Sequence, residues 1–230
     1  MFSKLLRGIK SFILYSLVIV SMVVAFIGFC IGISFIQQKL FVKGEYITYF
    51  IKYPYSYLMF VIMIIVGNKV VMLSFKKEKL SFMSKGGYLW AKIDKILMLA
   101  TIPLLYIVLT SVAIVTKDGI YDYSFYNLNG NKYRFSDVEY VDTGFIDWGK
   151  NKGEFFYNIE LENGTRLKLA YPSNPQPAGR YDDDTWQEYV DIDKYIMASG
   201  AEKEASEDGA KYVQMDSVYV DKLLSVIRNK

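Results

Sequence analysis

Long uncharged stretches alternate with short charged ones over the first half of the chain. One uncharged run extends from Ser11 to Gln38, a second covers Tyr55 to Phe75 with Lys69 as its single interruption, and a third covers Ile96 to Val115. A helix rises about 1.5 Å per residue and the apolar core of a bilayer is about 30 Å thick, so about 20 residues suffice to cross it. The pattern therefore predicts three transmembrane helices, at about residues 12–36, 54–75 and 96–115.

A different pattern begins at Ile120, where short segments rich in Tyr, Phe, Ile and Val are separated by Gly and Asn. Asn163-Gly164 stands between EFFYNIEL and TRLKLAY and predicts a tight hairpin, and Asn129-Gly130 indicates another turn. Thr185 with Glu188 forms a capping box, which starts a predicted helix at about 185–199. A second helix is expected at about 216–229, with a polar connection over 201–211. Residues 117–230 thus form a mostly β domain that follows a membrane domain over 1–116.

The charges divide the chain in the same place. Residues 1–116 carry 13 Lys/Arg and 3 Asp/Glu, whereas residues 117–230 carry 14 Lys/Arg and 21 Asp/Glu. A basic membrane half and an acidic soluble half predict the lipid bilayer as a partner and no nucleic acid. The N-terminus and the 76–95 connection together hold nine positive residues, against four on the other side of the predicted spans. The positive-inside rule then predicts a cytoplasmic N-terminus and an extracytoplasmic C-terminal domain.

The start of the chain also resembles a signal peptide, with Lys4, Arg7 and Lys10 ahead of apolar residues. The apolar core of a signal peptide usually has about 7–15 residues, and this run is much longer. We therefore expect the first helix to be retained in the membrane.

Five residues of the membrane half are candidates for specific roles. Gly28 and Gly32 form a GxxxG pattern that lets a second helix approach closely, although glycine is also simply common in membrane helices. We expect the partner helix to come from the same chain more readily than from a second copy. Lys69 is an intramembrane charge, which is a functional candidate by default, but its long side chain can snorkel to the headgroups and we favour that interpretation. Tyr88 and Trp90 lie beside lysines and are expected to anchor the chain at the interface.

The composition excludes several chemistries. The chain has no His and one Cys, Cys30, so Ser-His-Asp and Cys-His sites, ordinary zinc sites and intrachain disulfides are excluded. Three carboxylates at 182–184 suggest calcium, but their spacing is not that of a calcium loop, and acids before a helix are explained by its dipole. A glycosidase needs only two acids. The acids available for that are Asp137, Glu139, Asp142 and Asp147. Acids on exposed strand faces usually serve solvation, so we expect no enzyme, metal or cofactor.

One segment carries a family resemblance. The sequence KDGIYDYSFYNLNGNKYRFSDVEYVDTG follows hydrophobic spans and contains an aromatic-Ser-Asp-aliphatic step, Phe135-Ser136-Asp137-Val138. Over residues 116–200 it resembles the membrane-attached bacterial pleckstrin-homology-like domains. The resemblance implies a small antiparallel β-sandwich or barrel with C-terminal helices. It also implies a binding or scaffold role without catalytic residues.

These observations predict an α+β membrane protein, with three N-terminal transmembrane helices and a pleckstrin-like β domain. The expected function is a multi-pass protein that presents a β-rich interaction or sensing module at the membrane surface. The alternative is an accessory subunit of a larger complex in transport, secretion or defence, held through its helices by a protein partner or a second copy. An autonomous transporter is disfavoured, because one ionisable residue makes a poor pathway.

Overall fold

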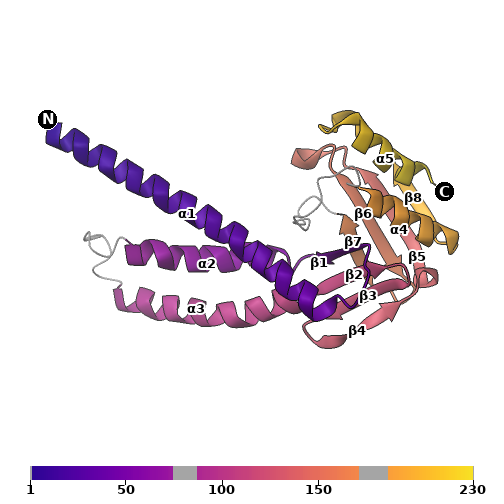
Figure 1. The fold of residues 1–230 in the computed structure, drawn as a ribbon, viewed down its shortest axis with the longest axis horizontal. Helices are drawn as coiled ribbons and strands as arrows, with labels where there is room; N and C mark the ends of the chain where they lie inside the picture. Colours follow the sequence, from indigo (N-terminus) through magenta and orange to yellow (C-terminus); the bar gives the residue numbers. More distant parts are fainter. Residues whose placement is uncertain (1, 75–86, 171–185, 230) are drawn as a thin grey trace.

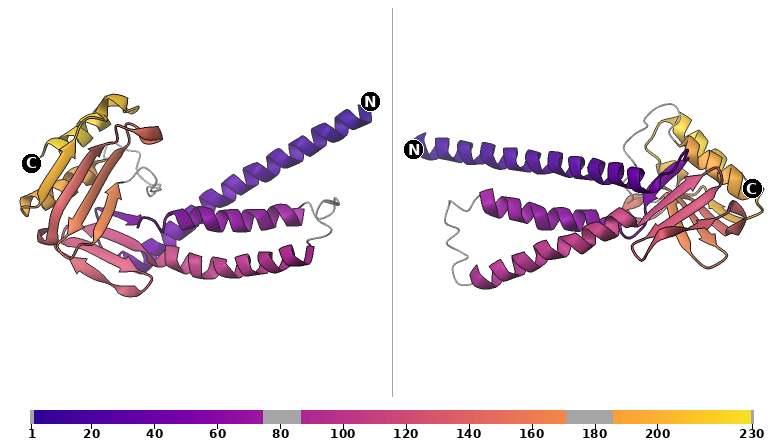
Figure 2. Two further views of the ribbon diagram at one scale, coloured as in Figure 1. Left: turned by 180° about the vertical axis from the view of Figure 1, so that it is seen from behind. Right: turned by 60° about the horizontal axis from the view of Figure 1, so that its bottom comes forward.

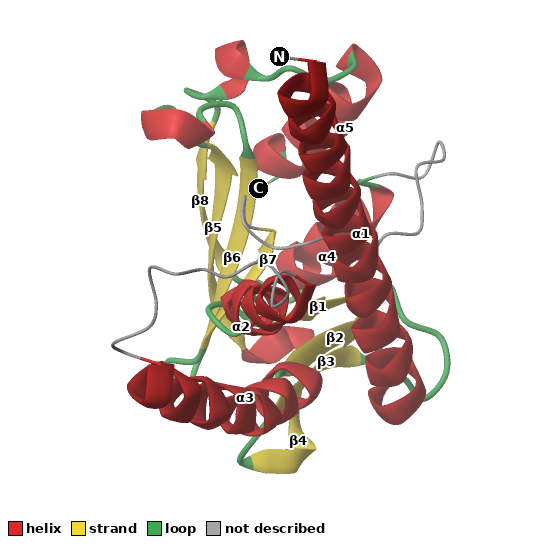
Figure 3. Ribbon diagram, turned by 90° about the vertical axis from the view of Figure 1, so that its left-hand side faces the viewer, coloured by secondary structure: helices red, strands yellow, loops and turns green. Residues whose placement is uncertain are grey.

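Three apolar helices extend from one end of two small β-sheets in the computed structural model, which describes residues 2–74, 87–170 and 186–229 (Figure 1). They are α1 (Phe2–Phe41), α2 (Tyr57–Ser74) and α3 (Gly87–Thr110). All three point to the same side, away from the sheets, in each of the views (Figures 1 and 2). Seen from the helical end, α1 crosses in front of the domain, and α2 and α3 lie to one side of α1 (Figure 3).

The prediction of three transmembrane helices is wrong. Among the described residues, only Ile19–Phe41 is long and apolar enough to cross a membrane, so by length and composition this N-terminal helix is a candidate membrane span or signal sequence. The apolar parts of α2 and α3 are shorter, Tyr57–Val70 and Lys95–Thr110. The third apolar run was misread because it is shared between two elements. Its last residues form strand β2 (Val112–Thr116), where β-branched side chains favour an extended backbone.

The first sheet has the order β1-β2-β3-β4, and every neighbouring pair is antiparallel. It contains β1 (Thr48–Ile51), β2, β3 (Gly119–Ser124) and β4 (Asn127–Tyr133). Strand β1 comes from the segment between α1 and α2, and it pairs with the strand that directly follows α3. The β domain therefore includes a piece of the N-terminal half.

The hairpin between β3 and β4 turns at Phe125 and Tyr126, so the turn expected at Asn129-Gly130 is misplaced. Gly130 lies inside β4 with a φ of +71°, beside a shift in the pairing register. A Cβ atom at this position would come within 2.7 Å of the Tyr123 ring. The position therefore requires glycine, because the Tyr123 ring packs so close to the backbone that a side chain does not fit.

The second sheet has the order β7-β6-β5-β8. It contains β5 (Val138–Phe145), β6 (Phe155–Leu161), β7 (Arg166–Ala170) and β8 (Glu202–Ser206). The hairpin predicted around Asn163-Gly164 is confirmed, since β6 and β7 pair antiparallel. The polar stretch 201–211, expected as a connection, contains β8, which pairs in parallel with β5. The described strands therefore form two small sheets, one of them with a parallel pair, and the predicted antiparallel sandwich or barrel is wrong.

Two helices cover one face of the second sheet (Figure 1). Helix α4 spans Gln187–Ala198 and α5 spans Ser217–Arg228, where the sequence indicated about 185–199 and 216–229. Short 3₁₀ turns lie at η2 (Phe135–Asp137), η3 (Gly149–Asn151) and η4 (Ala210–Tyr212). The core between helices and sheet includes Tyr157, Ile192 and Leu223, all fully buried, and it continues to Phe50 and Ile120 of the first sheet. One continuous core thus joins both sheets.

A charged cluster is buried inside this core. The Lys203 ammonium lies 2.6 Å from an Asp193 carboxylate oxygen, and the two side chains are only 2% and 1% exposed. Tyr157 donates its O–H to the same oxygen, and the Asn229 amide donates to the other. Lys203 also donates to the backbone carbonyls of Val226 and Asn229 at the end of α5. Every charge is therefore matched, and the lysine satisfies carboxyl-terminal carbonyls of a helix, where a cation is favoured.

The end of α1 is part of the fold. Gln37 is fully buried, and its side-chain amide donates to the carbonyl of Val108 at 2.8 Å. Val108 belongs to the last turn of α3, whose carbonyls have no partner within the helix. Phe41 packs with Tyr123 at a ring distance of 4.7 Å. Helix α1 is thus fastened to both α3 and the first sheet.

Candidate functional site

Gly28 and Gly32, the predicted helix-packing pair, face no other described part of the chain. A Cβ atom at either position would meet nothing within 4 Å. The close approach of α1 to α2 occurs elsewhere, at Gly67, where a Cβ would come within 2.5 Å of the Met22 side chain. Sequence reasoning missed Gly67 because no second small residue stands four positions away from it. The GxxxG face of α1 remains open.

The other membrane candidates lie at the far ends of α2 and α3. Lys69 is half-buried in the second half of α2, and its snorkelling stays a prediction. Tyr88 and Trp90 lie in the first turn of α3, and their side chains are outside the described residues. Their interfacial role also stays a prediction.

The acidic candidates do not form a common site. Residues 182–184, and Thr185 of the proposed capping box, lie outside the described residues; α4 itself begins after Trp186. In the described ranges no group of three or more His, Cys, Asp or Glu side chains is placed to hold a metal ion. Asp137 accepts the backbone N–H of Arg134 at 2.8 Å and thereby caps η2. Partial burial and the nearby Glu204 raise the pKa of Asp142, which accepts from Asn158 on the outer face of the second sheet.

A belt of aromatic side chains surrounds the junction between the helices and the sheets. Tyr46 stacks edge-on against Tyr49, and Tyr53 against Tyr57. Tyr55 makes the same kind of contact with Phe125, at a ring distance of 5.9 Å.

The tip of the β3–β4 hairpin is tied to the helices through this belt. Tyr106 of α3 donates its O–H to the carbonyl of Phe125, and the neighbouring Tyr126 is 75% exposed. The sequence carries a signal that was missed, namely five tyrosines within GEYITYFIKYPYSY. Aromatic residues at helix ends are typical of a membrane–water interface.

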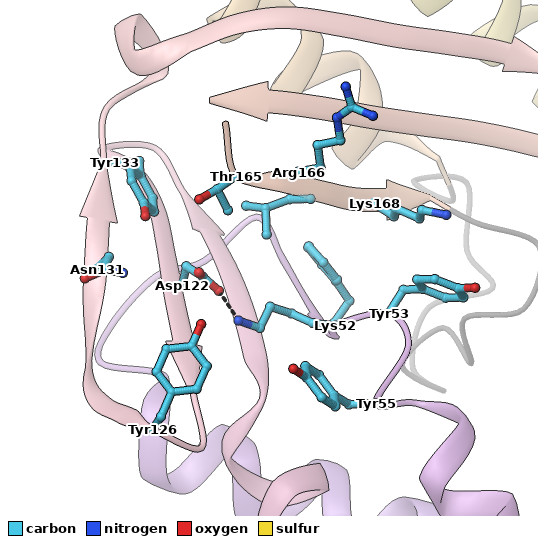
Figure 4. Close-up of a pocket in the computed structure, with 12 residues that line it drawn as sticks. Lys52, Tyr53, Tyr55, Asp122, Tyr126, Asn131, Tyr133, Thr165, Arg166 and Lys168 are labelled. Carbon is cyan, nitrogen blue, oxygen red and sulfur yellow. Dashed lines mark ion pairs between the residues drawn. The ribbon is translucent and has the colours of Figure 1, made fainter. Parts of the chain in front are cut away.

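A cavity of about 320 Å³ opens next to this belt, between the first sheet and β7 (Figure 4). The lining residues come from β1 and the segment before α2, from β3 and β4, and from the start of β7. They are Phe50, Lys52, Tyr53, Tyr55, Asp122, Tyr126, Asn131, Tyr133, Thr165, Arg166, Leu167 and Lys168. The lining combines three cations, one acid and four tyrosines, with few apolar groups.

An ion pair crosses the floor of the cavity. The Lys52 ammonium lies 2.6 Å from the Asp122 carboxylate, with side chains 11% and 7% exposed, and it also donates to the Ser124 hydroxyl at 2.6 Å. Lys52 follows β1 and Asp122 is in β3, so the lysine must pass over β2. Ala113 is the β2 residue opposite Asp122, and its small side chain leaves that path clear.

The two other cations lie on the wall formed by β7. Lys168 points toward Tyr53, and its ammonium lies 4.1 Å from the centre of that ring (Figure 4). Partial burial lowers the pKa of Lys168. Arg166 lies at the rim, where its exposed guanidinium pairs with Glu160 at 2.8 Å. Two positions apart in one strand, Arg166 and Lys168 share a face of the sheet.

Comparison of the chain with protein-family models, curated protein sequences and solved structures gave no match. The resemblance to the bacterial pleckstrin-homology-like domains therefore stays a prediction.

Proposed function

We propose that this protein is a membrane-anchored binding module, in which α1 crosses the bilayer and the two-sheet domain lies at the membrane surface. The observation that carries the proposal is α1 itself. Only 6% of its most apolar stretch is buried inside the protein, so its apolar side chains need an environment other than water. A core helix of a soluble domain would have these side chains covered.

Retention of α1 is favoured over removal as a signal sequence. Ile33, Gln37 and Phe41 are buried against the rest of the chain, and Gln37 caps α3. Cleavage after the apolar stretch would remove these contacts and leave the Val108 carbonyl without this donor. A signal sequence has no such role in the mature fold.

The aromatic belt supports the same placement. It lies where α1 ends and the sheets begin, which is the depth of the headgroups if α1 crosses the bilayer. Helices α2 and α3 leave the domain on the same side as α1 (Figure 2). They expose apolar side chains such as Phe60, Ile64 and Leu99. We expect α2 and α3 to lie against the membrane beside α1.

The orientation follows from the charges at the start of α1. Lys4, Arg7 and Lys10 precede the span, which favours a cytoplasmic N-terminus and places the β domain outside the cytoplasm. We propose that the domain serves interaction or sensing at the outer surface, without catalysis.

Fractionation of cells that carry a C-terminally tagged full chain tests the proposal. The expected result is a protein of the full 26.5 kDa mass that stays in the membrane pellet after an alkaline carbonate wash. Protease added to intact cells should remove the tag. A product shortened at its N-terminus and found in the soluble fraction would overturn the anchor, and a protected tag would overturn the orientation.

A second candidate function, an accessory subunit of a membrane complex, is favoured by one observation. The Gly28–Gly32 face of α1 meets no described residue of its own chain, so it is accessible to a helix of another subunit. Co-purification of stable partners that depend on this face would support the candidate.

A further inference from the structure

We propose that the β domain rests on the bilayer through two separate aromatic turns, the β3–β4 turn at Phe125-Tyr126 and the connection between β5 and β6 at Trp148. The partner of both turns is the lipid interface. The inference deepens the proposed function and rests on its membrane anchor. Tyr126 is 75% exposed and Trp148 is 74% exposed, which makes them the two most exposed large hydrophobic side chains in the described part of the chain. Tryptophan in particular is mostly covered in folded proteins.

The Trp148 connection lies at the same end of the domain as the helices. At one end of β7, the Lys168 ammonium lies over the ring of Tyr53, which precedes α2. At the other end, Asn163 of the β6–β7 turn donates to Tyr133, the last residue of β4. Strand β7 therefore runs toward the helices, and β6, its antiparallel partner, begins near them. The connection that leads into β6 is thus on the helix side of the second sheet, as Figure 1 also shows.

The backbone of this connection is held by the segment around η4. A Cβ atom at Gly153 would come within 2.5 Å of the Tyr212 carbonyl oxygen, and one at Gly209 within 2.4 Å of the Ile146 carbonyl oxygen. The two segments thus pack more closely than side chains permit. Trp148 is exposed on a restrained backbone, so its insertion into the interface orders little additional chain.

The chemistry of both turns suits the interface of a bilayer. Trp and Tyr place an apolar ring toward the acyl chains while the indole N–H or the phenol O–H stays hydrated, and they are enriched at this depth. Asp147 and Lys150 flank Trp148 and are exposed, so the connection carries charges of both signs. Zwitterionic headgroups, which also carry both signs, fit such a surface. The contact should therefore depend on the aromatic rings more than on anionic lipid.

Spin-label accessibility of the full chain in phosphatidylcholine vesicles tests the proposal. Cys30→Ser removes the single cysteine of the chain. A nitroxide is then attached to a cysteine introduced by Asp147→Cys, next to Trp148, or by Leu128→Cys, close to the β3–β4 turn. The matched control is Glu162→Cys, because Glu162 is exposed and follows β6 at the end of the sheet away from the helices.

The depth of each label is measured by its collisions with oxygen, which is enriched in the bilayer, and with a nickel chelate, which stays in water. The labels at residues 147 and 128 are expected to show a ratio of oxygen to nickel collisions several-fold higher than the label at residue 162. Equal ratios at residues 147 and 162 would overturn the proposal. Rare collisions with both reagents at residue 147 would indicate burial against protein, such as a second copy of the chain, and would overturn it too.

Two variants of Trp148 assign the contact to its ring. Trp148→Ser should lower the ratio at residue 147 toward that of the control, and Trp148→Phe should keep most of it; an unchanged ratio in Trp148→Ser would overturn the proposal. Since Trp148 is exposed, both variants should fold normally, which circular dichroism checks.

Two further readings separate this proposal from its alternatives. High salt should leave the ratio at residue 147 unchanged, and its loss would show that charge, rather than the aromatic ring, holds the connection at the membrane. Flotation of the vesicles distinguishes the two levels of the model. If the anchor fails, the protein does not float with the vesicles, whereas a protein that floats while its label at residue 147 is in water contradicts this inference alone.

Discussion

Lys203 in β8 and Asp193 in α4 form an ion pair of 2.6 Å that is almost completely buried. The pair connects a strand, two helices and the end of the chain, because Tyr157 and Asn229 donate to the same carboxylate. Burying two charges is favourable only when each is fully matched, which is the case here.

Replacement of Asp193 by Ala should therefore destabilise the protein strongly. The variant leaves the Lys203 ammonium buried without its counter-charge, and we expect a loss of about 3–5 kcal/mol in the free energy of unfolding. Urea unfolding followed by circular dichroism measures it. Glu207→Gln is the control, since it breaks the exposed pair with Arg228 and should change little. Similar losses in both variants would contradict the role assigned to the buried pair.

Gln37→Leu should loosen the connection between α1 and the domain. The substitution keeps the volume but leaves the Val108 carbonyl without its side-chain donor, at a cost of about 1–3 kcal/mol. Limited proteolysis should then cut more readily between α1 and β1. Gln38→Leu is a neighbouring control, because the exposed side chain of Gln38 donates to the Tyr46 hydroxyl and does not contact the end of α3 through any hydrogen bond described. An unchanged cleavage rate in Gln37→Leu would exclude this bond as the fastening of α1.

Leucine at Gly67, where an added side chain would meet Met22, and leucine at Gly28 and Gly32, where it would meet no other described part of the chain, should affect the stability of the protein differently. Gly67→Leu must push against Met22 and should separate α1 from α2, which lowers the thermal unfolding midpoint. Gly28→Leu combined with Gly32→Leu meets no described atom and should leave that midpoint unchanged. Loss of a co-purifying subunit in the double variant alone would show that the open face of α1 holds a partner. Retention of every partner would argue against the accessory-subunit function.

Alkaline pH should unfold the domain through its buried tyrosines. Burial and the adjacent Asp193 raise the pKa of Tyr157 well above its usual value, and burial raises that of Tyr189. Below about pH 10 these phenols are protonated in both states, so their contribution is fully present. Above pH 10 the unfolded chain loses protons that the folded chain retains, so stability falls as the pH rises.

Tyrosinate absorbance measured during an alkaline titration tests this expectation. Tyr157 and Tyr189 should ionise only together with unfolding, whereas Tyr140, whose hydrogen bond to Glu204 raises its pKa to about 12, should titrate in the folded protein. Tyr157→Phe should remove one tyrosine from the cooperative step. A gradual titration of all tyrosines would contradict the burial of this hydroxyl.

Local patterns predicted those elements whose partners are close in the sequence. The β6–β7 hairpin follows from alternating residues around Asn163-Gly164, and its pairing requires nothing distant. The amphipathic pattern also indicated α4 and α5, because each buries one face, with Ile192, Ile196 and Leu223 among the buried residues. In these places the local preference agrees with the tertiary structure.

Elements that depend on distant partners were missed. Strand β8 reads EKEAS, with Glu202 and Glu204 exposed and Lys203 turned inward, so it shows no apolar alternation. The inward lysine is explained by Asp193 of α4 and by carbonyls at the end of α5, and no local pattern reveals these distant partners. The run at Ile96–Val115 was read as one helix because hydropathy alone does not show where a helix ends and a strand begins.

The candidate cavity was equally invisible in the sequence. Lys52 lies between the first two predicted spans, and Asp122 lies in the predicted β domain, 70 positions further along the chain. They meet because β1 joins the first sheet, which is a long-range event. The aromatic belt could have been predicted, since its tyrosines are clustered in the sequence before α2.

The position of β1 at the edge of the first sheet has a consequence for biosynthesis. The segment Thr48–Ile51 leaves the ribosome before its partner Val112–Val115 exists, since α2 and α3 are made in between. At typical translation rates this delay is on the order of seconds. During that time the apolar strand Tyr49-Phe50-Ile51 has no strand partner, and its backbone groups are unsatisfied. Chaperones or the membrane surface must shield it, and nascent chains stalled before residue 112 should be the most prone to aggregate.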